Sequence, residues 1–61
     1  MFKYYKGFVV EKDKTLDSDI CYFKRINGDK FISEDGIERS VDSAEYKDVL
    51  RIIDNIIAKA K

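Results

Sequence analysis

The sequence predicts an α+β domain, in which an antiparallel β-meander of three to four strands packs against one C-terminal amphipathic helix (order β-β-β-(β)-α). Three observations predict this class. The N-terminal segment alternates apolar and polar residues, two glycine turns separate the short apolar segments that follow, and apolar residues then recur at three- and four-residue steps over residues 44–61. The 61 residues are expected to form one small domain, 1–61.

Residues 2–12 alternate as a half-buried strand does. One face would carry Phe2, Tyr4, Phe8 and Val10. Gly7 lies inside this segment, where a glycine indicates a bulge or the close approach of another backbone. Residues 12–19 are polar and are predicted to be the longest loop.

Residues 20–26 are rich in β-branched and aromatic residues and are predicted to be the second strand. Asn27-Gly28 follows, and this pair is the strongest hairpin signal because both residues tolerate the positive φ of a type I′ turn. The third strand would then be residues 29–34. A two-residue turn sets Arg25 opposite Lys30, an unfavourable like-charge pair, so the register is left open.

Asp35-Gly36 predicts a second turn, after which residues 37–41 form either a short fourth strand or only a link to the helix. Asp42 or Ser43 is expected to cap the helix, and Asp42 with Glu45 has the spacing of a capping box.

The apolar face of the predicted helix, residues 44–61, is wide. It covers an arc of roughly 160°, whereas a helix on a single core needs little more than about 100°. The excess predicts self-association, because a chain of this size has little else with which to cover it. The residues expected at the contact between two copies are Leu50, Ile52, Ile56 and Ile57.

Composition excludes several other ways of stabilising a small domain. Cys21 is the only cysteine and there is no histidine, so neither an internal disulfide nor a Cys/His zinc site can form. The 12 basic and 12 acidic residues balance, which gives no overall attraction to nucleic acid or to an anionic membrane. No apolar run reaches the ~18 residues of a transmembrane helix, and the N-terminus lacks the apolar region of a signal peptide. With one free thiol, a cytoplasmic location is expected.

Candidates for chemistry are few, and we expect no enzyme and no cofactor. Cys21 lies in a predicted strand without a histidine to activate it, so it is interpreted as a small core residue. The carboxylates of the long loop lack the spacing of a calcium-binding loop and are interpreted as solvated; they are Glu11, Asp13, Asp17 and Asp19. The carboxylates around the second turn could serve acid–base chemistry, but a chain of this size is too small to build the deep pocket that such chemistry needs. These carboxylates are Glu34, Asp35 and Glu38.

A nucleic-acid interface is the alternative. Lysines alternate with aromatic residues at the N-terminus, and a sheet face built this way can contact phosphates and stack on bases. The residues assigned to this contact are Lys3, Lys6 and Lys24. Acidic residues on the same strands oppose it, because binding to phosphates scales with the net charge neutralised.

The chain resembles short proteins encoded by phages and prophages. The residues that carry the resemblance are Tyr5-Lys6-Gly7-Phe8, Asp35-Gly36, Ser43, Lys47 and Ile53-Asp54. In such proteins a Tyr-Lys/Arg-Gly-aromatic strand starts a β-meander that ends in one helix. The resemblance implies a protein that binds a host protein, including components of antiviral defence, and it assigns no functional residues.

Three strands followed by a helix are also similar to integrase arm-type DNA-binding domains, although those sheets are strongly basic. The sequence therefore predicts a non-enzymatic, homodimeric protein-binding module. It would be a phage or prophage accessory factor that binds and modulates a host protein, such as an inhibitor of host defence. A small DNA-binding protein is the alternative.

Overall fold

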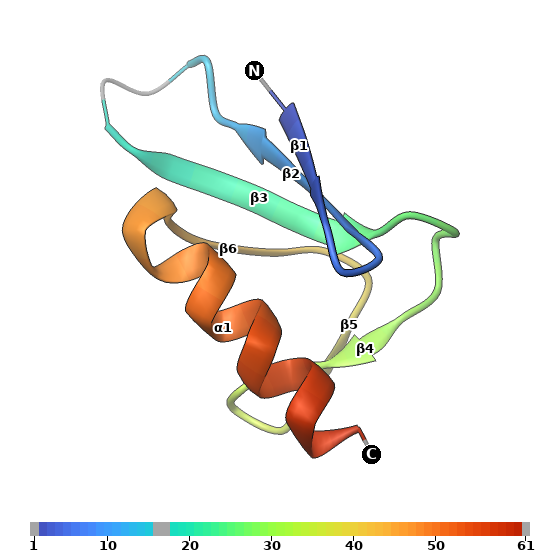
Figure 1. Ribbon diagram of the computed structural model, residues 1–61. Helices are drawn as coiled ribbons and strands as arrows, with labels where there is room; N and C mark the ends of the chain where they lie inside the picture. The colour runs from blue at the N-terminus through green and yellow to red at the C-terminus, as the bar shows by residue number, and fades with distance from the viewer. Residues whose placement is uncertain (1, 16–17, 61) are drawn as a thin grey trace.

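The computed structural model describes residues 2–15 and 18–60 and confirms the α+β class. A four-stranded antiparallel sheet has the strand order β1-β2-β3-β6, and the single helix α1 packs on one of its faces (Figure 1). Strands β4 and β5 pair with each other in a separate two-stranded ribbon. The bounds are β1 Phe2–Tyr5, β2 Phe8–Lys12, β3 Ile20–Arg25, β4 Phe31–Ile32, β5 Glu38–Arg39, β6 Asp42–Glu45 and α1 Tyr46–Lys59.

The segment predicted as one N-terminal strand is two strands joined by a tight turn. Lys6 and Gly7 have φ of 47° and 87°, and positive φ at both central residues is what a type I′ hairpin turn requires. The prediction of a bulge at Gly7 was therefore wrong, and the turn reverses the chain instead. Consequently Phe8 is buried, whereas Tyr4, predicted on the same face, lies on the other side of the sheet beside Val9.

The predicted hairpin at Asn27-Gly28 is also wrong, because β3 pairs with β2 and β6 and not with β4. The pair still makes a turn, in which the Gly28 N–H bonds the Arg25 carbonyl at 3.1 Å. The Asn27 side chain then bonds the backbone N–H and the carboxylate of Asp29, at 3.1 and 2.8 Å. This local network leads the chain away from the sheet and avoids the like-charge pair that the hairpin register would have imposed.

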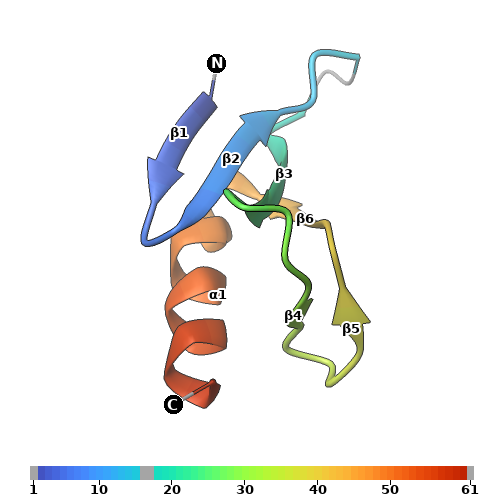
Figure 2. The same cartoon turned by 90° about the vertical axis from the view of Figure 1, so that its right-hand side faces the viewer.

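The turn at Asp35-Gly36 is confirmed. It joins β4 to β5, with the Gly36 N–H bonded to the Ser33 carbonyl at 2.9 Å. Arg39 closes the turn by donating to both carboxylate oxygens of Asp35, at 2.7 and 2.6 Å. Figure 2 shows the resulting ribbon beside the C-terminal half of α1, outside the main sheet.

The helix begins at Tyr46, two residues later than predicted. Residues 42–45 pair with β3 and form strand β6, in which Ala44 lies opposite Cys21. The capping box does not form: Glu45 is the N-cap and makes no side-chain cap bond, and the Asp42 carboxylate accepts from the Ser33 hydroxyl and the Ser43 N–H. The Tyr46 N–H, at the first residue of the helix, donates instead to the Asp19 carbonyl at 2.8 Å.

The core lies between the sheet and the helix. It contains Phe8, Val10, Cys21, Phe23, Phe31, Val49, Ile53 and Ile56. Three phenylalanine rings meet at its centre, with Phe8 and Phe31 edge to face at 5.3 Å and Phe23 stacked on Phe31 at 5.9 Å. The Phe31 ring thus anchors the ribbon to the sheet.

Candidate protein-binding surface

Among the residues that the structure describes, no helix or strand covers the face of the sheet turned away from α1. Burial alternates along β2 and β3, so that Phe8 and Phe23 point to the helix and their neighbours point outward. Cross-strand register then assigns to this outer face Tyr4 of β1, Val9 and Glu11 of β2, Tyr22 and Lys24 of β3, and Ser43 of β6. We call these six residues the outer face.

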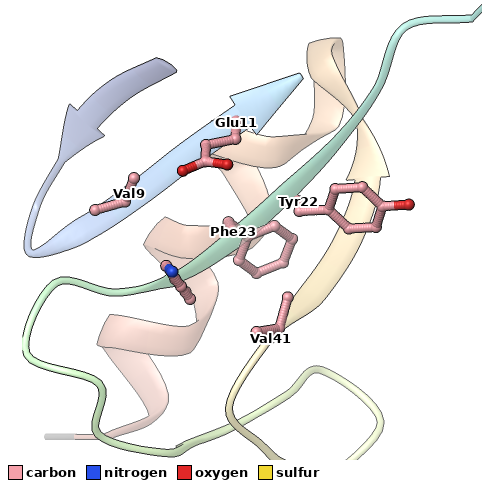
Figure 3. A pocket seen from close by; sticks show the side chains of 6 residues that line it. Val9, Glu11, Tyr22, Phe23 and Val41 are labelled. Carbon is pink, nitrogen blue, oxygen red and sulfur yellow. The ribbon is translucent and has the colours of Figure 1, made fainter. Parts of the chain in front are cut away.

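A shallow hollow of about 210 Å³ lies on the outer face and continues to Val41, just before β6. Figure 3 shows Val9 and Glu11 on β2, Tyr22 on β3 and Val41 around it. Tyr22 and Val41 are 43% and 46% exposed, so a substantial apolar area meets solvent here. The hollow is smaller than the ~300 Å³ at which pockets for small molecules begin, and it suits a protein side chain better.

Tyr22 is held in position by a buried carboxylate. Its hydroxyl donates to Asp13 Oδ2 at 2.5 Å, and the Thr15 N–H and hydroxyl donate to Asp13 Oδ1 at 2.8 and 2.6 Å. The hydrogen bonds from Thr15 and Tyr22 hold the pKa of Asp13 below its ordinary value, and the bond to Asp13 raises the pKa of Tyr22. The ring of Tyr22 is therefore held in position within the isolated chain.

A second apolar surface lies on and beside the ribbon. Ile26, Ile32 and Ile37 are each more than half exposed, at 55%, 54% and 54%. Ile32 also borders a small hollow together with Ile56 and the end of α1. The ribbon surface does not adjoin the outer face, because α1 and the ribbon lie on the other side of the sheet (Figure 2).

The helix offers less free apolar surface than the sequence indicated. Ile56 is only 2% exposed and belongs to the core, and Ile52 and Ile57 are half-buried against it. Leu50 is also half-buried. The reason is that the fourth strand of the sheet is β6, outside residues 37–41 where a fourth strand was considered, and the ribbon adds Phe31 to the layer that covers the helix. The sequence could not show this, since β6 lies within the segment predicted to cap the helix.

The lysines assigned to nucleic acid are not brought together. Lys24 lies on the outer face, whereas Lys3 lies opposite Val10 and so on the helix side of the edge strand. Lys6 turns to the helix and forms an ion pair with Asp54 at 2.8 Å, and the same carboxylate accepts from the Tyr5 hydroxyl at 3.0 Å. The hydrogen bond that Lys6 donates to Asp54 raises the pKa of Lys6 and lowers the pKa of Asp54.

The other candidates have structural partners. Cys21 is buried, its thiol lies 3.6 Å from the Asp19 carbonyl, and burial raises the pKa of the thiol, which keeps it protonated. The Glu34 carboxylate accepts from Asn55 at 2.9 Å and pairs with Arg51 at 3.5 Å. Within the described residues no group of three acidic or thiol side chains is placed to hold a metal ion; Asp17 lies outside them.

No protein-family model matches this chain, and neither a search of curated proteins nor one of solved structures returns a match. In the part of the chain that the structure describes, no helix has the length and apolar character needed to cross a bilayer.

Proposed function

We propose that this protein acts as a non-enzymatic protein-binding module and that its outer face is the binding surface. The observation that carries the proposal is the hollow between Val9, Tyr22 and Val41, on a sheet face that no described helix or strand covers. An antiparallel sheet can leave one face to solvent, but such a face is then usually polar. Here two valines and two tyrosines occupy or border it, and an exposed apolar patch is typical of an interaction site.

The biological setting is proposed from the sequence alone. The phage or prophage origin, and a host-defence component as the target, are proposals that rest on the resemblance of the Tyr5–Phe8 opening and its companions. DNA binding is not proposed as a second function, since the structure separates Lys3, Lys6 and Lys24.

Site-specific photo-crosslinking tests the proposed surface. A benzophenone amino acid replaces Val41 in one sample and Ala58, exposed on the helix, in the control. In the cells that produce the protein, the Val41 probe is expected to form a covalent adduct with a protein identified by mass spectrometry, and the Ala58 probe is not. With purified components, Val41→Glu should weaken binding to that protein and Ala58→Glu should not. Absence of any protein adduct from Val41, or equal adducts from both positions, would overturn the proposal.

A further inference from the structure

Two opposite charges lie at a diagonal on the outer face. Glu11 of β2 is directly opposite Tyr22 of β3, and Lys24 of β3 is directly opposite Val9 of β2. Glu11 and Lys24 are therefore diagonal neighbours, about 7–8 Å apart as such positions are in antiparallel pairs. Among the described residues, neither side chain has an ion-pair or hydrogen-bond partner, whereas the side chains of six other lysines and arginines form ion pairs. These four residues form the corners of a square, and its other diagonal joins Val9 and Tyr22.

This pattern is complementary to itself. Consider two copies whose outer faces meet, with a twofold axis that lies between the two sheets and parallel to them. The axis carries each position on one face to the position on the other face that lies equally far on the opposite side of the axis. If the axis runs along the Val9–Tyr22 diagonal, Glu11 of one copy faces Lys24 of the other, and the reverse contact forms at the same time. Val9 and Tyr22 then lie on the axis and meet their own counterparts.

We propose that a second copy of this chain occupies the outer face, sheet against sheet, with two reciprocal Glu11–Lys24 ion pairs flanking a Val9 and Tyr22 centre. This inference rests on the proposed function and names the partner at the same surface. Facing sheets pack about 10 Å apart, a gap that valine and tyrosine side chains fill. The dimer would have four layers, helix–sheet–sheet–helix, and would leave the ribbon isoleucines of both copies free for a different protein.

Charge complementarity argues for a second copy over other occupants. An unrelated partner would have to supply one cation and one anion at the matching diagonal, whereas this chain carries both in place. The pair also fixes the orientation, since rotating one sheet by a half turn about the normal to its face would set like charges together. The apolar residues of α1 offer no comparable surface, because Ile56 is buried and Ile52 half-buried within one chain.

Charge reversal with mixing tests the inference. The Glu11→Lys chain presents two cations on the outer face and the Lys24→Glu chain two carboxylates, so each should lose self-association by at least about tenfold. An equimolar mixture of the two should restore a dimer, which contains one chain of each kind. Sedimentation equilibrium at millimolar protein reports the masses, and native mass spectrometry distinguishes mixed dimers from like ones.

Lys59→Glu is the matched control, because it makes the same change of charge at an exposed helix position. It should self-associate as the unaltered protein does. Circular dichroism and thermal unfolding establish that each variant folds. A monomeric unaltered protein at millimolar concentration would overturn the inference, as would reversals that leave the dimer intact or a mixture that fails to associate.

The photo-crosslinking experiment separates the two proposals. A monomeric protein whose Val41 probe still reacts with another protein would remove the second copy and keep the protein-binding function. A monomer whose probe reacts with no protein would remove both.

Discussion

Asp13 and Tyr22 are joined by a hydrogen bond of 2.5 Å, from the tyrosine hydroxyl to the carboxylate, that ties the loop after β2 to the outer face. The bond and those from Thr15 hold the pKa of Asp13 below its ordinary value. A lowered carboxyl pKa contributes stability above the unfolded pKa of about 3.9, and this is lost as the pH falls through the folded value. The raised pKa of Tyr22 contributes stability below about pH 10, which is lost as the pH rises through the folded value.

Tyr22→Phe is expected to remove this bond while keeping the ring. The unaltered protein should have the larger free energy of unfolding. The difference between the two proteins should be greatest near neutral pH and should shrink toward both acidic and alkaline pH. Urea titrations over about pH 3 to 11 measure it. A difference that does not change with pH would show that the Asp13–Tyr22 bond is not its source.

Gly7→Ala is expected to destabilise the β1–β2 hairpin by roughly 1 kcal/mol. Gly7 has φ of 87° and no heavy atom lies within 4 Å of an added Cβ, so the cost is backbone strain and not a clash. Gly7→Asn should cost less, because asparagine adopts positive φ more readily than alanine. Urea unfolding gives both values. Equal losses for the two variants would contradict a turn with positive φ at this position.

Phe31→Ala is expected to cost about 3–5 kcal/mol, as large-to-small changes at buried phenylalanines do. Phe31 is 3% exposed and contacts the rings of Phe8 and Phe23. A domain of this size has about that much stability in total, so the variant should be largely unfolded at room temperature. Ile32→Ala, at an exposed position of the same strand, is the control and should stay folded by circular dichroism. A folded Phe31→Ala protein would show that the ribbon is not part of the core.

The class of the fold could be predicted from local patterns, and the pairing of its strands could not. The helix stripe at Val49, Ile53 and Ile56 and the turn at Asp35-Gly36 are encoded within a few residues, and both are confirmed. Strand β6 depends on pairing with β3, whose partner residues lie 19 to 25 positions earlier in the chain, and its sequence Asp-Ser-Ala-Glu has no strand pattern. Local capping propensity therefore misled the prediction there.

Part of the candidate site could be predicted from the sequence. Alternation from Phe8 to Glu11 already separates Val9 and Glu11 from Phe8 and Val10. Which of the two faces the helix covers depends on the sheet order, and the Lys6-Gly7 turn moved Tyr4 across the sheet. The wide helix face directed the predicted contact between copies to the helix, because the pairing of residues 42–45 with β3 and the packing of Phe31 have no local signal in the sequence.

The most direct test of whether the outer face binds a second copy is an NMR dilution series. Isotopically labelled protein is diluted stepwise, and the amide chemical shifts are recorded at each concentration. From millimolar to micromolar concentration, we expect shift changes at Val9, Glu11, Tyr22 and Lys24, with none along the exposed side of α1 at Arg51 and Ala58. Spectra that do not change with concentration, or changes centred on the helix, would contradict the account.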